Sequence, residues 1–147
     1  MTSHIPRVLL GLAFVVFATN YFVPFLPAPS APPPEAGAFL GVFVASGFLG
    51  FIKALELATG LLLLSNRLVP LALALLAPIL VGITAFHILL EPAGLVVPLV
   101  LVALELIVAW SYRDAFAPML RWTTPRQPLL VKPRATRAQK RVMSIAS

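Results

Sequence analysis

Four long apolar runs, separated by polar or proline-rich turns, restrict the fold of this chain more than any other feature. They cover about residues 8–26, 48–64, 68–90 and 95–112. A helix of roughly 20 apolar residues spans a hydrocarbon core of about 30 Å, and each run is close to that length. We therefore predict an all-α polytopic membrane protein, with an antiparallel four-helix transmembrane domain over residues 1–120.

The composition excludes ordinary soluble folds. Of the 147 residues, 60% are hydrophobic and 11% are charged, and the mean hydropathy is +0.98. Soluble domains carry about 25% charged residues, and a soluble globule of this length could not bury so much apolar surface. The sequence contains no cysteine, which excludes disulfides, thiol relays, iron–sulfur clusters and zinc–thiolate sites.

The first apolar run has two interpretations. Arg7 precedes it, as a basic residue precedes the apolar core of a signal peptide. The run is longer than the usual core of about 7–15 residues, and it leads into the proline-rich segment 27–37. We therefore expect an uncleaved membrane span.

The second apolar stretch, residues 38–64, also has two interpretations. As one steeply tilted helix it would be about 40 Å long, which exceeds the thickness of the hydrocarbon core. Gly47 and Gly50 interrupt it. We favour a short interfacial helix over about residues 38–46, which leads into a span that starts near Phe48.

Two short turns join the last three spans, at residues 65–67 and 91–94. Short connections imply that consecutive helices are antiparallel neighbours. Pro70 suits the first turn of a helix, and Pro78 inside the third span predicts a kink.

The distribution of basic residues predicts the orientation in the membrane. Arg7, Arg67 and the eight Lys and Arg residues from Arg113 onward share one side of this topology, and Glu35 and Glu91 lie on the other. Because basic residues concentrate in cytoplasmic segments, we place both termini in the cytoplasm of a bacterial inner (plasma) membrane.

Residues 121–147 are predicted to form a basic, mostly disordered cytoplasmic tail that prolines interrupt. We expect this tail to bind anionic lipid headgroups. The candidate lipid contacts are Arg126, Lys132, Arg134, Arg137, Lys140 and Arg141. No nucleic-acid-binding motif accompanies these basic residues, so we predict no nucleic-acid partner.

Polar residues inside the spans are the candidates for function. A charge at the bilayer centre costs roughly 2.5–3.5 kcal/mol on insertion scales, and it usually faces the bundle interior. The candidate cavity, ligand or proton-relay residues are Glu105, Glu56, Lys53, His87, Asn20 and Thr84. If they converge, these side chains would form a polar cavity that opens toward the external side. We assign no catalytic residue and no metal ligand.

Several of these residues also have purely structural interpretations. Lys53 and Glu56 are spaced for an intrahelical ion pair, and His87 suits a solvated or hydrogen-bonded histidine. Glu91 suits a loop charge or an N-terminal cap of the last helix. Glu105 has no partner in its own helix, so it must pair with another helix, stay protonated or face water. It is therefore the best single candidate.

Two stretches resemble helices of the DoxX family. Residues 50–67 (GFIKALELATGLLLLSNR) resemble its second helix, and residues 69–90 (VPLALALLAPILVGITAFHILL) resemble its third. The opening RVLLGLAFVVFATNYF and the ending LELIVAWSYRDAF fit the same pattern, so the resemblance covers roughly residues 7–120. The residues that carry it, in order, are Glu56, Gly60, Pro78, His87 and Glu105.

The resemblance implies a four-helix inner-membrane protein. Some DoxX-like proteins are subunits of thiosulfate:quinone oxidoreductases, and others associate with oxidative-stress enzymes. We therefore expect an accessory subunit of a quinone-linked redox system rather than a self-sufficient enzyme, with quinone as the one candidate cofactor. The candidate partners are the bilayer, a soluble oxidoreductase and a second copy of the chain. Two alternatives stay open: a small proton-coupled transporter or solute-binding protein, and an anchor or assembly factor without its own activity.

Overall fold

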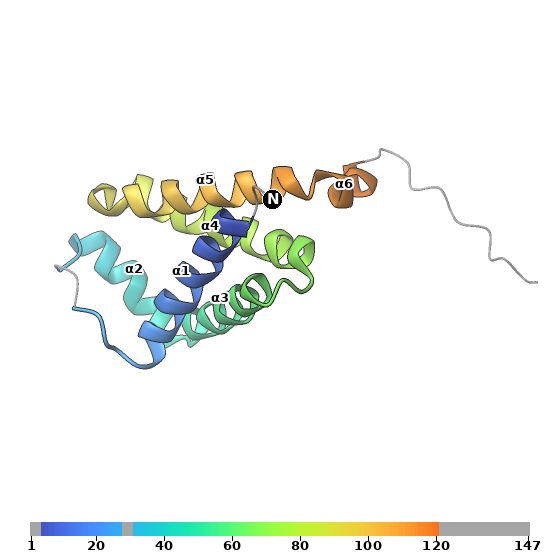
Figure 1. The fold of residues 1–147 in the computed structure, drawn as a ribbon. Coiled ribbons are helices and arrows are strands. Elements are labelled where there is room, and N and C mark those ends of the chain that lie inside the picture. Colours follow the sequence, from blue (N-terminus) through green and yellow to red (C-terminus); the bar gives the residue numbers. More distant parts are fainter. Residues whose placement is uncertain (1–3, 28–30, 121–147) are drawn as a thin grey trace, which may run out of the picture. The chain divides into compact units, whose positions relative to one another are not determined.

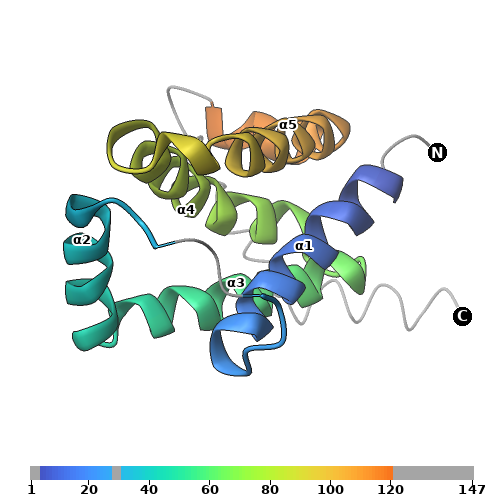
Figure 2. The same cartoon turned by 90° about the vertical axis from the view of Figure 1, so that its left-hand side faces the viewer.

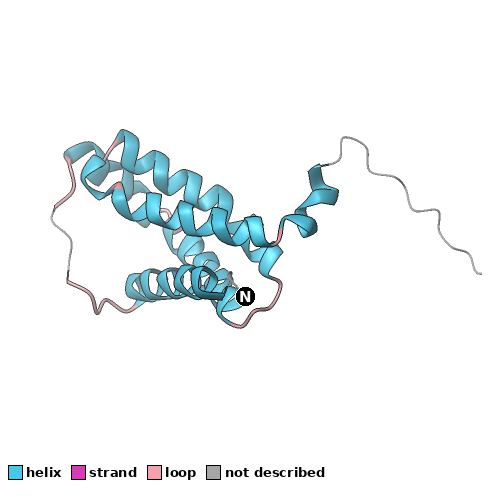
Figure 3. Cartoon of the chain, turned by 45° about the horizontal axis from the view of Figure 1, so that its top comes forward, coloured by secondary structure: helices cyan, strands magenta, loops and turns pink. Residues whose placement is uncertain are grey.

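The computed structural model describes residues 4–27 and 31–120, and their regular elements are all helical (Figure 3). The predicted all-α class is confirmed for this part of the chain. The elements are α1 (His4–Phe22), α2 (Pro34–Ala45), α3 (Phe48–Leu64), α4 (Val69–Leu89), the 3₁₀ helix η1 (Pro92–Gly94), α5 (Val96–Ser111), α6 (Arg113–Phe116) and the 3₁₀ helix η2 (Ala117–Leu120).

The chain divides into two units, Met1–Ala117 and Pro118–Ser147, and the helices α1 to α6 belong to the first. The predicted basic tail, residues 121–147, lies outside the described residues. So do its six candidate lipid contacts, Arg126, Lys132, Arg134, Arg137, Lys140 and Arg141.

Within residues 4–27 and 31–120, two helices, α1 and α4, are each long and apolar enough to cross a membrane, and the number rises to four if each of two bent helix pairs forms one span. Large apolar side chains of α4 and α5 are exposed on the protein surface. Val81 and Leu89 of α4 are 69% and 76% exposed, and Trp110 of α5 is 72% exposed. Such a surface suits lipid rather than water as the surrounding medium.

The first unit is built around pairwise helix contacts. The α1 helix packs on α3 and α5, α4 packs on α3 and α5, and α2 packs on α3 (Figures 1 and 2). Leucine side chains dominate the shared core, which includes Leu10, Phe14, Leu63, Leu73, Leu76 and Leu80. The α1 and α3 helices approach closely: a Cβ atom on Gly60 would lie 3.0 Å from the carbonyl oxygen of Gly11.

The first helix ends earlier than predicted, at Phe22 rather than near residue 26. Pro24 explains the difference, because a proline disfavours helical geometry in the residue before it. The side chain of Asn20 then organises the exit of the chain. Its Oδ1 accepts hydrogen bonds from the backbone N–H groups of Phe25 and Leu26, at 2.9 and 2.8 Å.

Residues 38–64 belong to two separate helices, α2 and α3, as we predicted, and do not form one tilted helix. The axes of α2 and α3 differ by 80°. Gly47 lies at the break with a φ of +76°, a left-handed conformation that glycine adopts without steric cost. The interfacial position of α2 stays a prediction.

The two short turns predicted at residues 65–67 and 91–94 both lie between helices of the structure. The α4 helix starts at Val69 with Pro70 in its first turn, and it continues through Pro78. Before it, Asn66 and Leu68 have positive φ angles of 56° and 50°, which reverse the chain within a few residues.

Arg7 has a structural role that the sequence did not reveal. The residue is only 5% exposed, and its guanidinium group donates hydrogen bonds to the backbone carbonyl groups of Leu63 and Leu64. The last carbonyl groups of a helix have no partner within the helix, and they carry partial negative charge. Arg7 therefore caps the C-terminus of α3 and fixes the start of α1 against it.

Candidate functional site

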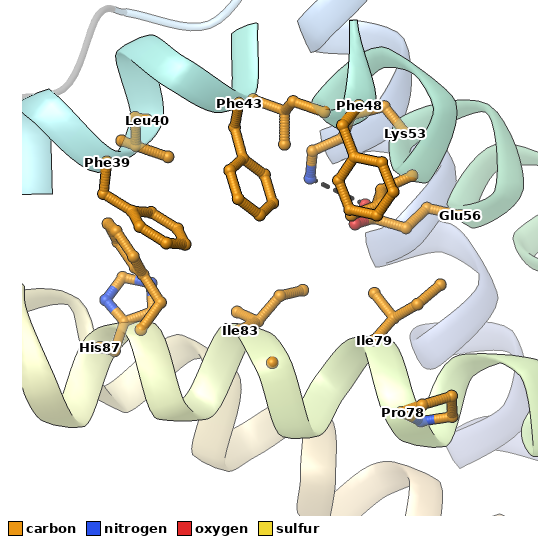
Figure 4. A pocket seen from close by; sticks show the side chains of 14 residues that line it. Phe39, Leu40, Phe43, Phe48, Lys53, Glu56, Pro78, Ile79, Ile83 and His87 are labelled. Atoms are coloured by element: carbon orange, nitrogen blue, oxygen red, sulfur yellow. Dashed lines mark hydrogen bonds and ion pairs between the residues drawn. The ribbon is translucent and has the colours of Figure 1, made fainter. Parts of the chain in front are cut away.

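A pocket of about 570 Å³ lies between α2, α3 and α4 (Figure 4). Pockets for small organic ligands typically measure about 300–1,000 Å³ and combine apolar walls with a few polar groups. Most of the side chains that line this pocket are aromatic or aliphatic, and three carry ionisable groups: Lys53, Glu56 and His87.

Aromatic rings form a connected wall along the pocket. The rings of Phe39 and Phe43, both on α2, stack with their centroids 4.6 Å apart. Phe39 also lies 5.8 Å from Phe86 of α4, and Phe43 lies 5.3 Å from Phe48 at the start of α3. Phe39 and Phe43 point from α2 toward α4 across the pocket, where Ile79 and Ile83 face them (Figure 4). This wall suits a flat conjugated ring or an unsaturated hydrocarbon chain.

Lys53 and Glu56 form the predicted ion pair at one part of the pocket wall, with 2.8 Å between Nζ and Oε2 (Figure 4). The Glu56 side chain is 2% exposed, whereas that of Lys53 is 20% exposed. The second carboxylate oxygen of Glu56, Oε1, is buried and has no hydrogen-bond partner among the described residues. The pair therefore leaves one acceptor of Glu56 and further ammonium protons of Lys53 unused.

His87 lies near the end of α4 and faces Phe39 of α2 (Figure 4). Its Nδ1 is 2.7 Å from Oε2 of Glu91 and 3.0 Å from the backbone oxygen of the same residue. We predicted Glu91 as a loop charge or a helix cap, but its side chain makes no capping hydrogen bond. It binds the imidazole instead.

Gly94 completes the surroundings of this pair. A Cβ atom at position 94 would overlap the Glu91 carboxylate and would lie only 2.7 Å from Nδ1 of His87. The turn after α4 therefore packs tightly against the histidine, and a side chain at this position would displace the ring.

Three of the six candidate residues do not line this pocket. Asn20 binds the backbone after α1, as described above. The Thr84 hydroxyl donates to the Leu80 carbonyl group at 2.7 Å within α4. Glu105 is 8% exposed and lies on α5, where its Oε1 has no hydrogen-bond partner among the described residues. The structure thus brings Lys53, Glu56 and His87 to one pocket and leaves Glu105 elsewhere.

The α2 wall of the pocket was absent from the sequence-based list. We assigned this helix to the membrane interface and gave it no role in binding. The available signal was the spacing of Phe39 and Phe43, which puts two rings on one helix face. That signal did not indicate which helix the face would meet.

No group of three or more His, Cys, Asp or Glu side chains is placed to hold a metal ion within residues 4–27 and 31–120. Comparison of the chain with protein-family models, with curated proteins and with solved structures finds no match.

Proposed function

We propose that this chain is a DoxX-like protein of the bacterial inner membrane that binds a quinone as an accessory subunit of a redox system. In this proposal α1, α3, α4 and α5 are the four antiparallel spans, α2 lies at the external interface, and both termini are cytoplasmic. The basic residues on the side of the termini support this orientation. A soluble oxidoreductase would supply or remove the electrons.

The pocket between α2, α3 and α4 is the observation that carries the proposal. A quinone has a flat ring with two oxygen atoms and an apolar tail, and this pocket offers rings, aliphatic walls and polar groups within one cavity. The Lys53 ammonium group can donate a hydrogen bond to a ligand oxygen while it stays paired with Glu56, because it has three protons. His87 adds a second polar group to the pocket wall.

We expect that a side chain added at Gly82 blocks quinone binding. Gly82 lines the pocket, and no atom lies within 4 Å of a Cβ built on it. Gly82→Leu should therefore fill part of the cavity and weaken the binding of a decyl-tailed benzoquinone about tenfold or more, which corresponds to about 1.4 kcal/mol. Titration calorimetry of the purified protein in detergent measures this affinity.

Gly41→Leu is the matched control for this experiment. Gly41 lies on α2 outside the pocket lining, and its Cβ position is also free of neighbours within 4 Å. Equal affinity of both variants and the unaltered protein would place the quinone elsewhere. Absence of quinone from solvent extracts, together with no heat on titration, would reject the proposal.

Proton-coupled transport is a second candidate function, and Glu105 favours it. A buried carboxyl group in the middle of α5, without an ion-pair partner among the described residues, is the arrangement that proton-carrying membrane proteins use. A transporter would cycle this group between protonated and ionised forms.

Glu105→Gln separates the two functions, because Glu105 lies outside the pocket. We expect the variant to bind the benzoquinone with unchanged affinity. If the protein is a proton-coupled transporter, the same variant should lose proton uptake in proteoliposomes, which a pH-sensitive dye reports. Glu35→Gln, at the exposed start of α2, is the control and should leave both measurements unchanged. Weakened quinone binding in Glu105→Gln would contradict the assignment of the pocket.

A further inference from the structure

We infer that the pocket selects the reduced, hydroxyl-bearing form of its ligand, and that His87, oriented by Glu91, accepts the hydrogen bond from that hydroxyl group. The inference rests on the proposed quinone site and specifies which redox form the site prefers. Two features of the described residues support it: the hydrogen bonds of His87 and the close packing around that side chain.

The partners of His87 determine where its proton lies. Both atoms that face Nδ1, the carboxylate Oε2 and the backbone oxygen of Glu91, are hydrogen-bond acceptors. Nδ1 must therefore carry the proton. In a neutral imidazole the other nitrogen, Nε2, then has a free electron pair and can only accept a hydrogen bond. No described residue forms a hydrogen bond with Nε2, and His87 lines the pocket.

The packing around the pair keeps this arrangement in place. Gly94 approaches both partners so closely that a Cβ atom there would overlap the Glu91 carboxylate and crowd the imidazole ring. On the adjacent side, the Phe86 ring lies 5.3 Å from the His87 ring in an edge-to-face arrangement. The ring therefore has little freedom to flip and present Nδ1 to the pocket. Glu91 acts as a positioning residue, since it fixes the tautomer through His87.

Glu56 does not compete with His87 as an acceptor, because its Oε2 is bound to Lys53 and its Oε1 is buried. The redox preference therefore depends on Nε2 of His87. The oxidised ring has only carbonyl oxygens, which are acceptors, so it cannot pair with Nε2. The hydroquinone ring carries two hydroxyl donors.

The experiment compares the affinities of a decyl-tailed benzoquinone and its hydroquinone for the full-length protein, under anaerobic conditions in detergent. We expect the hydroquinone to bind about three- to tenfold more tightly, the typical effect of one buried hydrogen bond. His87→Phe should bring this ratio close to one, because the ring is kept and the acceptor is lost. Phe43→Leu, the control, should weaken both forms equally and preserve the ratio.

Nuclear magnetic resonance tests the role of Glu91 without any ligand. The sequence has two histidines, so His4→Gln leaves His87 as the only imidazole. The ¹⁵N spectrum of its neutral form should show a protonated Nδ1 and an unprotonated Nε2. In the same background, Glu91→Leu removes the side-chain acceptor at Nδ1, so we expect more of the Nε2-protonated form and a smaller hydroquinone preference.

The outcomes distinguish this inference from the proposed function. Equal affinity for the two redox forms, or a preference that His87→Phe leaves unchanged, would overturn the inference while the quinone site stands. A ¹⁵N spectrum with a protonated Nε2 in the unaltered pair would do the same. Failure to bind either form would reject the proposed function itself, and the inference with it.

Discussion

Replacement of Lys53 by methionine is expected to lower the free energy of unfolding by about 3 kcal/mol, the lower end of the range for a broken buried ion pair. The loss of stability is expected because Lys53 is the ion-pair partner of a buried carboxylate. The Glu56 side chain is 2% exposed, and its Oε2 lies 2.8 Å from Lys53 Nζ. Without Lys53, the buried carboxylate would keep no charged partner within the part of the chain that the structure describes. Unfolding of the purified protein in detergent, followed by circular dichroism, measures the loss.

The double variant Lys53→Met/Glu56→Leu is the control for this prediction. Removal of both charges avoids an uncompensated buried carboxylate, and such replacements are often neutral or stabilising. We therefore expect the double variant to recover most of the stability that the single variant loses. A single variant within about 0.5 kcal/mol of the unaltered protein, the range of ordinary surface substitutions, would mean that Glu56 is not confined as the structure places it.

The sequence predicted this ion pair because the interaction is local. Residues three or four apart in a helix share a face whatever the helix packs against, so Lys53 and Glu56 could be paired without knowledge of the fold. The helix break near Gly47 was predicted too, since glycine and the limited thickness of a bilayer are both visible in the sequence.

Contacts between helices could not be predicted in the same way. A helical pattern shows which residues share a face, but not which neighbour that face meets. Glu105 shows this limit: it was the leading candidate, yet it does not line the pocket. Arg7 shows it as well, because its partner Leu63 is 56 residues away in the sequence. The sequence shows Arg7 only as a basic residue in front of an apolar run, and its contact with the end of α3 depends on the fold.

The α3 helix links these features. One part of its surface carries Glu56 into the pocket, and another carries Gly60 into contact with α1. At its start, the 80° turn from α2 brings the Phe39 and Phe43 side chains toward α4. The geometry of the pocket therefore depends on where α3 sits, and the contact between α1 and α3 helps to set that position.

Replacement of Gly60 by valine is expected to lower the free energy of unfolding by about 2–3 kcal/mol, as overpacking of a tight contact does. A Cβ atom at this position would lie 3.0 Å from the Gly11 carbonyl oxygen, 3.0 Å from Cγ2 of Val15 and 3.2 Å from Cβ of Phe14. The nearest of these groups includes backbone, which cannot rotate away, so α1 and α3 must separate. Circular dichroism on heating measures the loss.

Gly41→Val is the matched control, because it makes the same change on an exposed helix face with no atom within 4 Å of the added Cβ. We expect it to change stability by no more than about 0.5 kcal/mol. The Gly60 variant should also weaken benzoquinone binding, since a displaced α3 moves Lys53 and Glu56 within the pocket. Unchanged stability of Gly60→Val would contradict the close approach of the two backbones. Lost stability with unchanged quinone affinity would instead show that the pocket holds its shape independently of α1.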